Sequence, residues 1–124
     1  MAKTRVLIVE DSPFIHKIIT RALCPEDFEV CGIGANGKEG VDLFSSLKPD
    51  VVTMDITMPV MDGLTATRKI MEVDPQAKIL MLSAMGDDAL VDEARTIGVR
   101  AFLQKPFKPD ELNTSIRLIL QGEL

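Results

Sequence analysis

Five polar residues stand at or directly after the ends of short apolar runs, where side chains can do chemistry. They are Glu10, Asp11, Asp55, Ser83 and Lys105. Asp55 stops the run VVTMD, and a lone carboxylate at the end of a buried strand is costly because it loses its hydration without gaining a partner. We therefore expect Asp55 to lie among groups that require its charge.

The elements that must position these residues alternate along the chain. Short β-rich apolar runs are followed by longer segments with apolar residues every three or four positions, which predicts five strand–helix units. The expected strands are residues 5–9, 29–33, 51–54, 78–82 and 99–103. Their near-continuous apolarity is typical of parallel strands covered on both faces, and right-handed crossovers then give a three-layer α/β sandwich. The pattern alone leaves several strand orders open.

Five helix starts are expected. Ser12 before Pro13 makes a good cap, and Asn36 with Glu39 three residues later resembles a capping box, because such side chains can accept the free N–H groups of a first helical turn. The third helix is expected after Asp62 and Gly63, and Pro109, Asp110 and Glu111 are expected to open the fifth. Asp87 and Asp88 suit the positive end of the fourth helix dipole. In the first helix, the expected apolar face comprises Phe14, Ile15, Ile18, Ile19 and Ala22, and His16 is expected to be an exposed residue on the other face.

The carboxyl ends of parallel strands share one rim, and ligands bind there at the switch point of the sheet. If the first strand lies between the second and the third, Glu10, Asp11 and Asp55 meet at this point, with Ser83 and Lys105 beside them. Two carboxylates about 5 Å apart repel by roughly 3 kcal/mol at an effective dielectric constant of 20, so the cluster needs counter-charge. Lys105 supplies one positive charge and a divalent cation can supply two.

Oxygen ligands without His or Cys select Mg²⁺, Mn²⁺ or Ca²⁺ over zinc, and few carboxylates with room for water suit Mg²⁺. With the charge masked, a phosphoryl group can approach Asp55, whose carboxylate would attack it to form an aspartyl phosphate. Lys105, Ser83 and the metal would spread the developing charge. The residues therefore predict Mg²⁺-dependent phosphoryl transfer to Asp55.

Four segments carry a family resemblance: VLIVEDS, VVTMDITMPVMDG, ILMLSAMG and AFLQKPF. Together and in this order they resemble the receiver domain of two-component response regulators, over essentially the whole chain, residues 1–124. The chain looks most like free-standing chemotaxis regulators of the CheY type. The resemblance implies a flavodoxin-like (βα)5 fold with a five-stranded parallel sheet in the order 2-1-3-4-5.

The resemblance also implies a role for each matching residue at the metal site. Asp55 would be the phosphoacceptor and a metal ligand, and Asp11 a direct Mg²⁺ ligand. Glu10 stands where Asp is commoner in the family and would act through water. Thr57 would contribute its backbone carbonyl to the metal.

Three further residues match the family's switching and catalytic positions. Ser83 would contact the phosphoryl group, Lys105 would be the active-site lysine, and Phe102 would be the aromatic switch. In the implied relay, the Ser83 hydroxyl moves toward the phosphoryl group and Phe102 turns into the vacated space. Phe102 lacks the hydroxyl of the frequent Tyr, and a cis peptide bond is implied between Lys105 and Pro106.

The expected function is that of a response regulator which accepts a phosphoryl group from a phosphohistidine on a sensor kinase. Its target would bind the face formed by the fourth helix, the fifth strand and the fifth helix. No separate substrate is expected, since the chemistry is self-phosphorylation and autodephosphorylation. The protein would be a monomer or a phosphorylation-dependent dimer, and chemotaxis is the pathway that overall likeness favours.

Composition supports one soluble domain. The chain has 124 residues, a net charge of -5 and 46% hydrophobic residues. Its acidic balance, without a run of Lys or Arg, argues against direct nucleic-acid binding. No apolar stretch is long enough for membrane insertion, and Cys24 and Cys31 are interpreted as reduced thiols, so the cytoplasm is expected.

The residues leave three other interpretations open. The chain could be a receiver domain cut from a larger transcriptional or enzymatic regulator. A Mg²⁺-dependent haloacid-dehalogenase-type phosphatase also uses an aspartyl phosphate, but it wants an acid two residues after the nucleophile, where this chain has Thr57. A flavodoxin-like FMN-binding protein is disfavoured because the chain has no Trp or Tyr to stack on the flavin.

Overall fold

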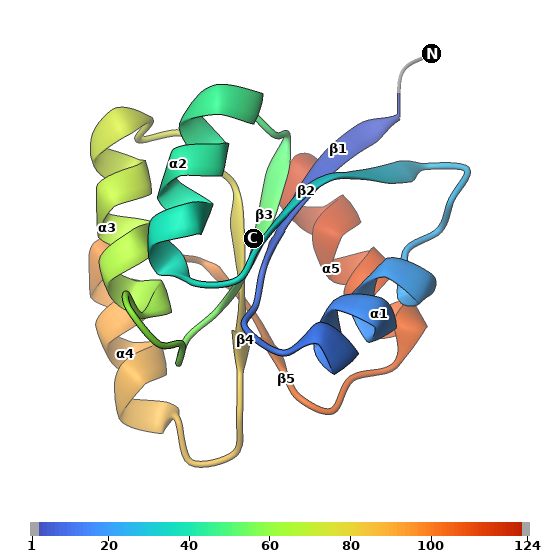
Figure 1. Cartoon of the computed structure of the whole chain (residues 1–124). Coiled ribbons are helices and arrows are strands. Elements are labelled where there is room, and N and C mark those ends of the chain that lie inside the picture. The colour runs from blue at the N-terminus through green and yellow to red at the C-terminus, as the bar shows by residue number, and fades with distance from the viewer. Residues whose placement is uncertain (1–2, 123–124) are drawn as a thin grey trace.

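The computed structural model describes residues 3–122, so the first two and last two residues of the expected 1–124 domain lie outside this range. Strands and helices alternate throughout (Figure 1). The strands are β1 (Thr4–Val9), β2 (Phe28–Gly34), β3 (Val51–Asp55), β4 (Ile79–Ser83) and β5 (Ala101–Gln104). The helices are α1 (Pro13–Ala22), α2 (Gly37–Leu47), α3 (Gly63–Val73), α4 (Asp88–Ile97) and α5 (Pro109–Leu120). All strand pairs are parallel and the order is β2-β1-β3-β4-β5, which confirms the predicted flavodoxin-like sandwich.

The sheet separates two apolar cores. Side chains of β1 alternate between them: Val6 and Ile8 pack with residues of α1 and α5, whereas Leu7 and Val9 pack with residues of α2, α3 and α4. Figure 1 shows the corresponding layers, with α2, α3 and α4 on one side of the sheet and α1 and α5 on the other. Because successive side chains of a strand point to opposite faces, a fully apolar strand is buried on both.

Local capping fixes the starts of three helices. The side chains of Ser12, Asn36 and Asp62 each accept a hydrogen bond from the backbone N–H three residues further along, at 3.4, 2.9 and 2.8 Å. These caps confirm the predicted starts of α1, α2 and α3. They also fix the loops that leave the carboxyl ends of β1, β2 and β3, where the polar cluster is expected.

The predicted buried face of α1 is wrong at two positions. Phe14 is 70% exposed and Ile18 is 37% exposed. The buried stripe is narrower and comprises Ile15, Ile19 and Ala22, which pack with the core on the α5 side of the sheet. Ile15, Ile19 and Ala22 are spaced by four and three residues and so share the helical face that contacts the sheet. Phe14 and Ile18 lie on the adjacent face, which points away from the core.

Cys24 and Cys31 are half-buried free thiols. Between residues 3 and 122, no helix combines the length and the apolarity needed to cross a lipid bilayer.

Candidate functional site

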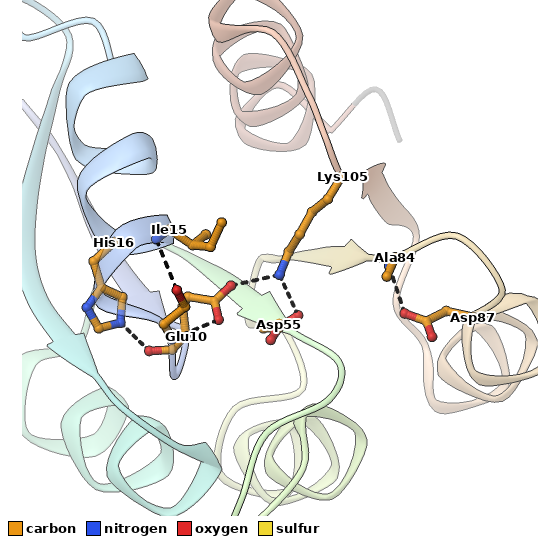
Figure 2. A network of polar contacts seen from close by, with 8 residues as sticks. Glu10, Ile15, His16, Asp55, Ala84, Asp87 and Lys105 are labelled. Carbon is orange, nitrogen blue, oxygen red and sulfur yellow. Dashed lines mark hydrogen bonds and ion pairs between the residues drawn. The ribbon is translucent and has the colours of Figure 1, made fainter.

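The sheet order brings the predicted polar residues to one rim. Because β1 lies between β2 and β3, Glu10 after β1 and Asp55 at the end of β3 are neighbours (Figure 2). Asp55 and Ser83 are the last residues of their strands rather than the first residues after them, so the ladder itself fixes their backbones. Oxygen atoms of Glu10, Asp11 and Asp55 all lie within 4.8 Å of one another.

Lys105 links two of these carboxylates. Its Nζ donates to Glu10 Oε1 at 2.8 Å and to Asp55 Oδ1 at 2.9 Å, and Figure 2 shows the ammonium group between them. Burial by itself would lower the pKa of Lys105, but the hydrogen bonds and the attraction of the two carboxylates outweigh it and raise this pKa above its ordinary value. The peptide bond between Lys105 and Pro106 is cis, as the resemblance implies.

Hydrogen bonds fix both the backbone and the side chain of Glu10. Its carboxylate is 1% exposed and accepts both from Lys105 and, through Oε2, from the Ser12 N–H at 3.2 Å. Its own N–H donates to the Gly34 carbonyl at 2.9 Å, and its carbonyl accepts from the ring Nε2 of His16. Glu10 therefore has a fixed backbone and a fixed side chain.

His16 is the site residue that the sequence interpretation missed. It was expected to be exposed, but it is half-buried and its ring points back to the Glu10 carbonyl (Figure 2). The available signal was its position in the first turn of the helix that directly follows Glu10, because a side chain there leans toward the helix N-terminus. His16 thus ties the start of α1 to the end of β1.

Asp11 differs from Glu10 because it is exposed. Hydrogen bonding with the Glu10 carboxyl group, followed by partial desolvation, raises the pKa of Asp11 above its ordinary value. A raised pKa means that the ionised form of Asp11 is disfavoured in the folded protein. The carboxyl group of Glu10 thus disfavours a charge on its neighbour Asp11.

The loop after Asp55 folds back tightly on the strand. A Cβ on Gly63 would lie 2.1 Å from the Asp55 carbonyl oxygen, and the Gly63 N–H donates to the Ile56 carbonyl at 2.7 Å. Only glycine fits such a close approach of two backbones. Thr57 lies exposed in this loop, two residues beyond Asp55.

Ser83 on β4 and Phe102 on β5 lie on the side of Asp55 that is away from β1. Ser83 is 7% exposed, and its carbonyl accepts from the Lys105 backbone N–H at 2.7 Å. Phe102 on β5 is half-buried against the core that α4 helps to form, and the guanidinium carbon of Arg95 on α4 lies 5.1 Å from its ring centroid. Phe102 therefore lies between the sheet and α4, at the edge of solvent.

The donor set suits a hard divalent cation. The cluster has three carboxylates and a single ammonium group, so negative charge is in excess. The side-chain atoms that it offers as metal ligands are carboxylate oxygens. Carboxylate oxygens without His or Cys bind Mg²⁺ and Ca²⁺ rather than zinc. The acidic cluster can thus hold a metal ion.

Comparison with known proteins agrees with this geometry. Residues 6–117 match the response regulator receiver domain family. The chain is similar to the chemotaxis protein CheY of Thermotoga maritima, with 46% identity over 87% of this chain and 90% of the relative. It is also similar to CheY of Bacillus subtilis, with 42% identity over 94% of this chain and 97% of the relative.

Solved structures show the same likeness. A chain in the crystal structure of the CheX-CheY-BeF3-Mg+2 complex from Borrelia burgdorferi superposes with a TM-score of 0.87 and is 36% identical, covering 94% of this chain and 88% of that chain. The family match spans most of the described residues, and the two CheY relatives are covered nearly end to end. The chain therefore belongs to the response regulator receiver domain family.

Proposed function

We propose that this protein is a response regulator that accepts a phosphoryl group on Asp55 from a phosphohistidine of a sensor kinase and thereby changes its affinity for a target protein. The observation that carries the proposal is the position of the Asp55 carboxylate at the end of β3, 2.9 Å from the Lys105 ammonium and within the cluster of three acids. A carboxylate in this position is partly neutralised yet remains a nucleophile.

The residues of the cluster fit Mg²⁺. Lys105 already bonds to Glu10 Oε1 and Asp55 Oδ1, and the Ser12 N–H bonds to Glu10 Oε2. These contacts support Asp11 and the second oxygen of Asp55 as the direct ligands. Glu10 would then act through a bound water, and the Thr57 carbonyl would complete the protein ligands. When bound, Mg²⁺ would supply positive charge against the oxygens of the incoming phosphoryl group.

In the transfer step, a carboxylate oxygen of Asp55 attacks phosphorus and forms the new O–P bond. The P–N bond to the donor imidazole breaks, and its electron pair stays on the leaving nitrogen, which takes up a proton. The Lys105 ammonium and the Ser83 hydroxyl hydrogen-bond the phosphoryl oxygens as charge builds on them. Hydrolysis of the aspartyl phosphate by water returns the protein to its starting state, so no separate substrate is consumed.

The switch would run from Ser83 to Phe102. Movement of the Ser83 hydroxyl toward the phosphoryl group leaves space behind β4, and the half-buried ring of Phe102 turns into it. This turn removes the ring from beneath Arg95 and alters the face formed by α4, β5 and α5, where the target would bind. The absence of a ring hydroxyl removes one hydrogen bond that would favour the outward orientation.

Pathway and setting are proposed from the relatives. The names of the similar CheY proteins support a place in chemotaxis, and the complex that contains CheX and CheY supports a protein target. We propose a cytoplasmic protein that is a monomer or a phosphorylation-dependent dimer, without direct contacts to nucleic acid.

The test is phosphorylation by a small phosphodonor. The parent protein incubated with acetyl phosphate and Mg²⁺ should gain one phosphoryl group by intact mass, and chelation of the metal should prevent it. Asp55→Asn should abolish the label. Asp62→Asn is the matched control, because Asp62 is an exposed acid in the same loop and Asn preserves its cap. Retention of the label by Asp55→Asn would refute the assignment.

A further inference from the structure

The loop between β4 and α4 is closed by a reciprocal pair of contacts between Ala84 and Asp87. The Ala84 N–H donates to Asp87 Oδ2 at 2.7 Å, and the Asp87 N–H donates to the Ala84 carbonyl at 3.2 Å. Figure 2 shows the Asp87 side chain reaching back from the start of α4 toward Ala84. The carboxylate is therefore tied to the end of β4.

Asp87 occupies the cap position of α4 without capping it. Within the described part of the chain, its side chain accepts no N–H from the first turn of α4, whereas Ser12, Asn36 and Asp62 each cap their own helices. Asp at this position ordinarily accepts a bond from the helix. Its bond to Ala84 is thus a feature of the loop rather than of helix formation.

The two contacts act on a single peptide unit. The Ser83 carbonyl and the Ala84 N–H belong to the same planar group, and the carbonyl accepts from the Lys105 N–H at 2.7 Å while the N–H donates to Asp87. Rotation or translation of this plane breaks at least one of the bonds. The backbone of Ser83 is therefore held away from any shift toward Asp55 while Lys105 and Asp87 both bond this peptide.

The rest of the loop offers little resistance to movement. Met85 is 85% exposed, and Gly86 has a φ of 94° with open space where a Cβ would stand. Asp87 is thus the side chain that restrains the carboxyl end of β4 from the α4 side.

We propose that Asp87 is a positioning residue that holds the Ser83–Ala84 peptide in its unphosphorylated place and releases the Ala84 N–H when Asp55 is phosphorylated. The inference rests on the proposed function of Asp55. A phosphoryl group on Asp55 brings strong acceptor oxygens to the rim next to the end of β4, so it competes with Asp87 for the Ala84 N–H. The contact with Asp87 consequently opposes the active state.

The test compares Asp87→Ala with Asp88→Ala. Asp88 is the adjacent acid, is exposed and begins α4, so its removal changes the same charge without touching Ala84. Beryllofluoride with saturating Mg²⁺ serves as the phosphoryl mimic, and its affinity is measured by titration of amide resonances. Thermal unfolding is measured without the mimic.

We expect Asp87→Ala to bind beryllofluoride about five- to tenfold more tightly than the parent, as loss of one ordinary solvent-exposed hydrogen bond predicts, while its melting temperature falls. Asp88→Ala should not combine tighter beryllofluoride binding with a lower melting temperature. Asp87→Asn, which keeps an acceptor without the charge, should be intermediate and provides the measurement if the Ala variant does not fold. In the parent protein, the Ala84 amide resonance should move when the mimic binds.

Weaker or unchanged affinity in both Asp87 variants, or equal gains in Asp87→Ala and Asp88→Ala, would overturn the inference while leaving the role of Asp55 intact. Failure of the parent protein to bind the mimic would instead overturn the proposed function, and this inference with it.

Discussion

The ammonium group of Lys105 lies 2.9 Å from the carboxylate of Asp55, joining the ends of β5 and β3 across the intervening β4. The same nitrogen is bonded to Glu10, so one cation serves two acids from different strands. A metal ion at this rim would compete with Lys105 for the charge of both.

Replacement of Lys105 should affect phosphorylation, metal binding and stability in different directions. Lys105→Met should slow labelling by acetyl phosphate by more than about tenfold, because an oxyanion stabiliser is lost. It should also tighten Mg²⁺ binding severalfold, since the acids are then uncompensated. The variant should lose about 2 kcal/mol of unfolding free energy without metal, because Glu10 stays buried without its partner. Calorimetric titration and urea unfolding measure these effects, with the exposed Lys108→Met as control. Unchanged metal affinity would contradict the competition.

The raised pKa of Asp11 makes a prediction about pH. A carboxyl group whose folded-state pKa lies above its ordinary value of 3.8 stabilises the fold when protonated, and this contribution is lost as pH rises through the folded-state pKa. Asp11→Asn should therefore unfold at higher urea than the parent at neutral pH in metal-free buffer, with the advantage shrinking as pH falls toward 3.8. Added Mg²⁺ should stabilise the parent and not the variant. A stability gain that is independent of pH would exclude this origin.

His16 should influence the metal site through the backbone of Glu10. His16→Leu should weaken Mg²⁺ binding severalfold and lower the free energy of unfolding by about 1 kcal/mol, because the Glu10 carbonyl loses its hydrogen-bond donor. His16→Gln places an N–H at a similar distance and should restore most of the affinity. Thr20→Val removes a different hydrogen bond of α1, the 2.8 Å bond from its hydroxyl to the His16 carbonyl, and should leave Mg²⁺ affinity unchanged. Equal losses in His16→Leu and His16→Gln would show that the ring is needed for packing alone.

Asn113 should be a stability position. It is 7% exposed, accepts from the Cys24 N–H at 2.9 Å, and donates to the carbonyls of Ala22 and Pro109 at 2.8 and 2.7 Å. Asn113→Ala leaves these partly buried groups without their side-chain partner and should cost about 1–3 kcal/mol in urea unfolding. The exposed Thr114→Ala on the same helix should cost much less. Beryllofluoride affinity should be unchanged in both variants.

The sequence predicted those parts of the fold that depend on local patterns. The caps at Ser12 and Asn36 were predictable because their partners lie three residues away, and Asp62 marked the start of α3 although its role as a cap is seen only in the structure. The strand order was not available from the apolar runs, which are too alike to specify neighbours, and it came from the family resemblance. The face of α1 was misjudged at Phe14 and Ile18 because periodicity shows which residues are apolar and not how wide the contact is.

At the site, the chain positions of the acids and of Lys105 predicted that these groups would gather once the strand order was known. The roles of His16 and Asp87 were not predictable in the same way. Each depends on a side chain that turns back toward the preceding strand, although residue type alone favours an exposed helix position for His16 and a helix cap for Asp87. Such orientations are decided by the loop conformation, which single-residue preferences do not contain.

The helices on the two sides of β5 are attached very differently. Helix α5 buries Leu112, Asn113, Ile116 and Ile119 and is tied to the α1–β2 connection by the Asn113 bonds and the 2.7 Å pair of Arg117 with Asp27, whereas α4 buries only Ala94 among its described residues. A target bound across both helices would contact a fixed α5 and a movable α4. The affinity of the target would then depend on the position of α4 relative to α5. A covalent link between the two helices would make binding insensitive to the state of the acidic rim.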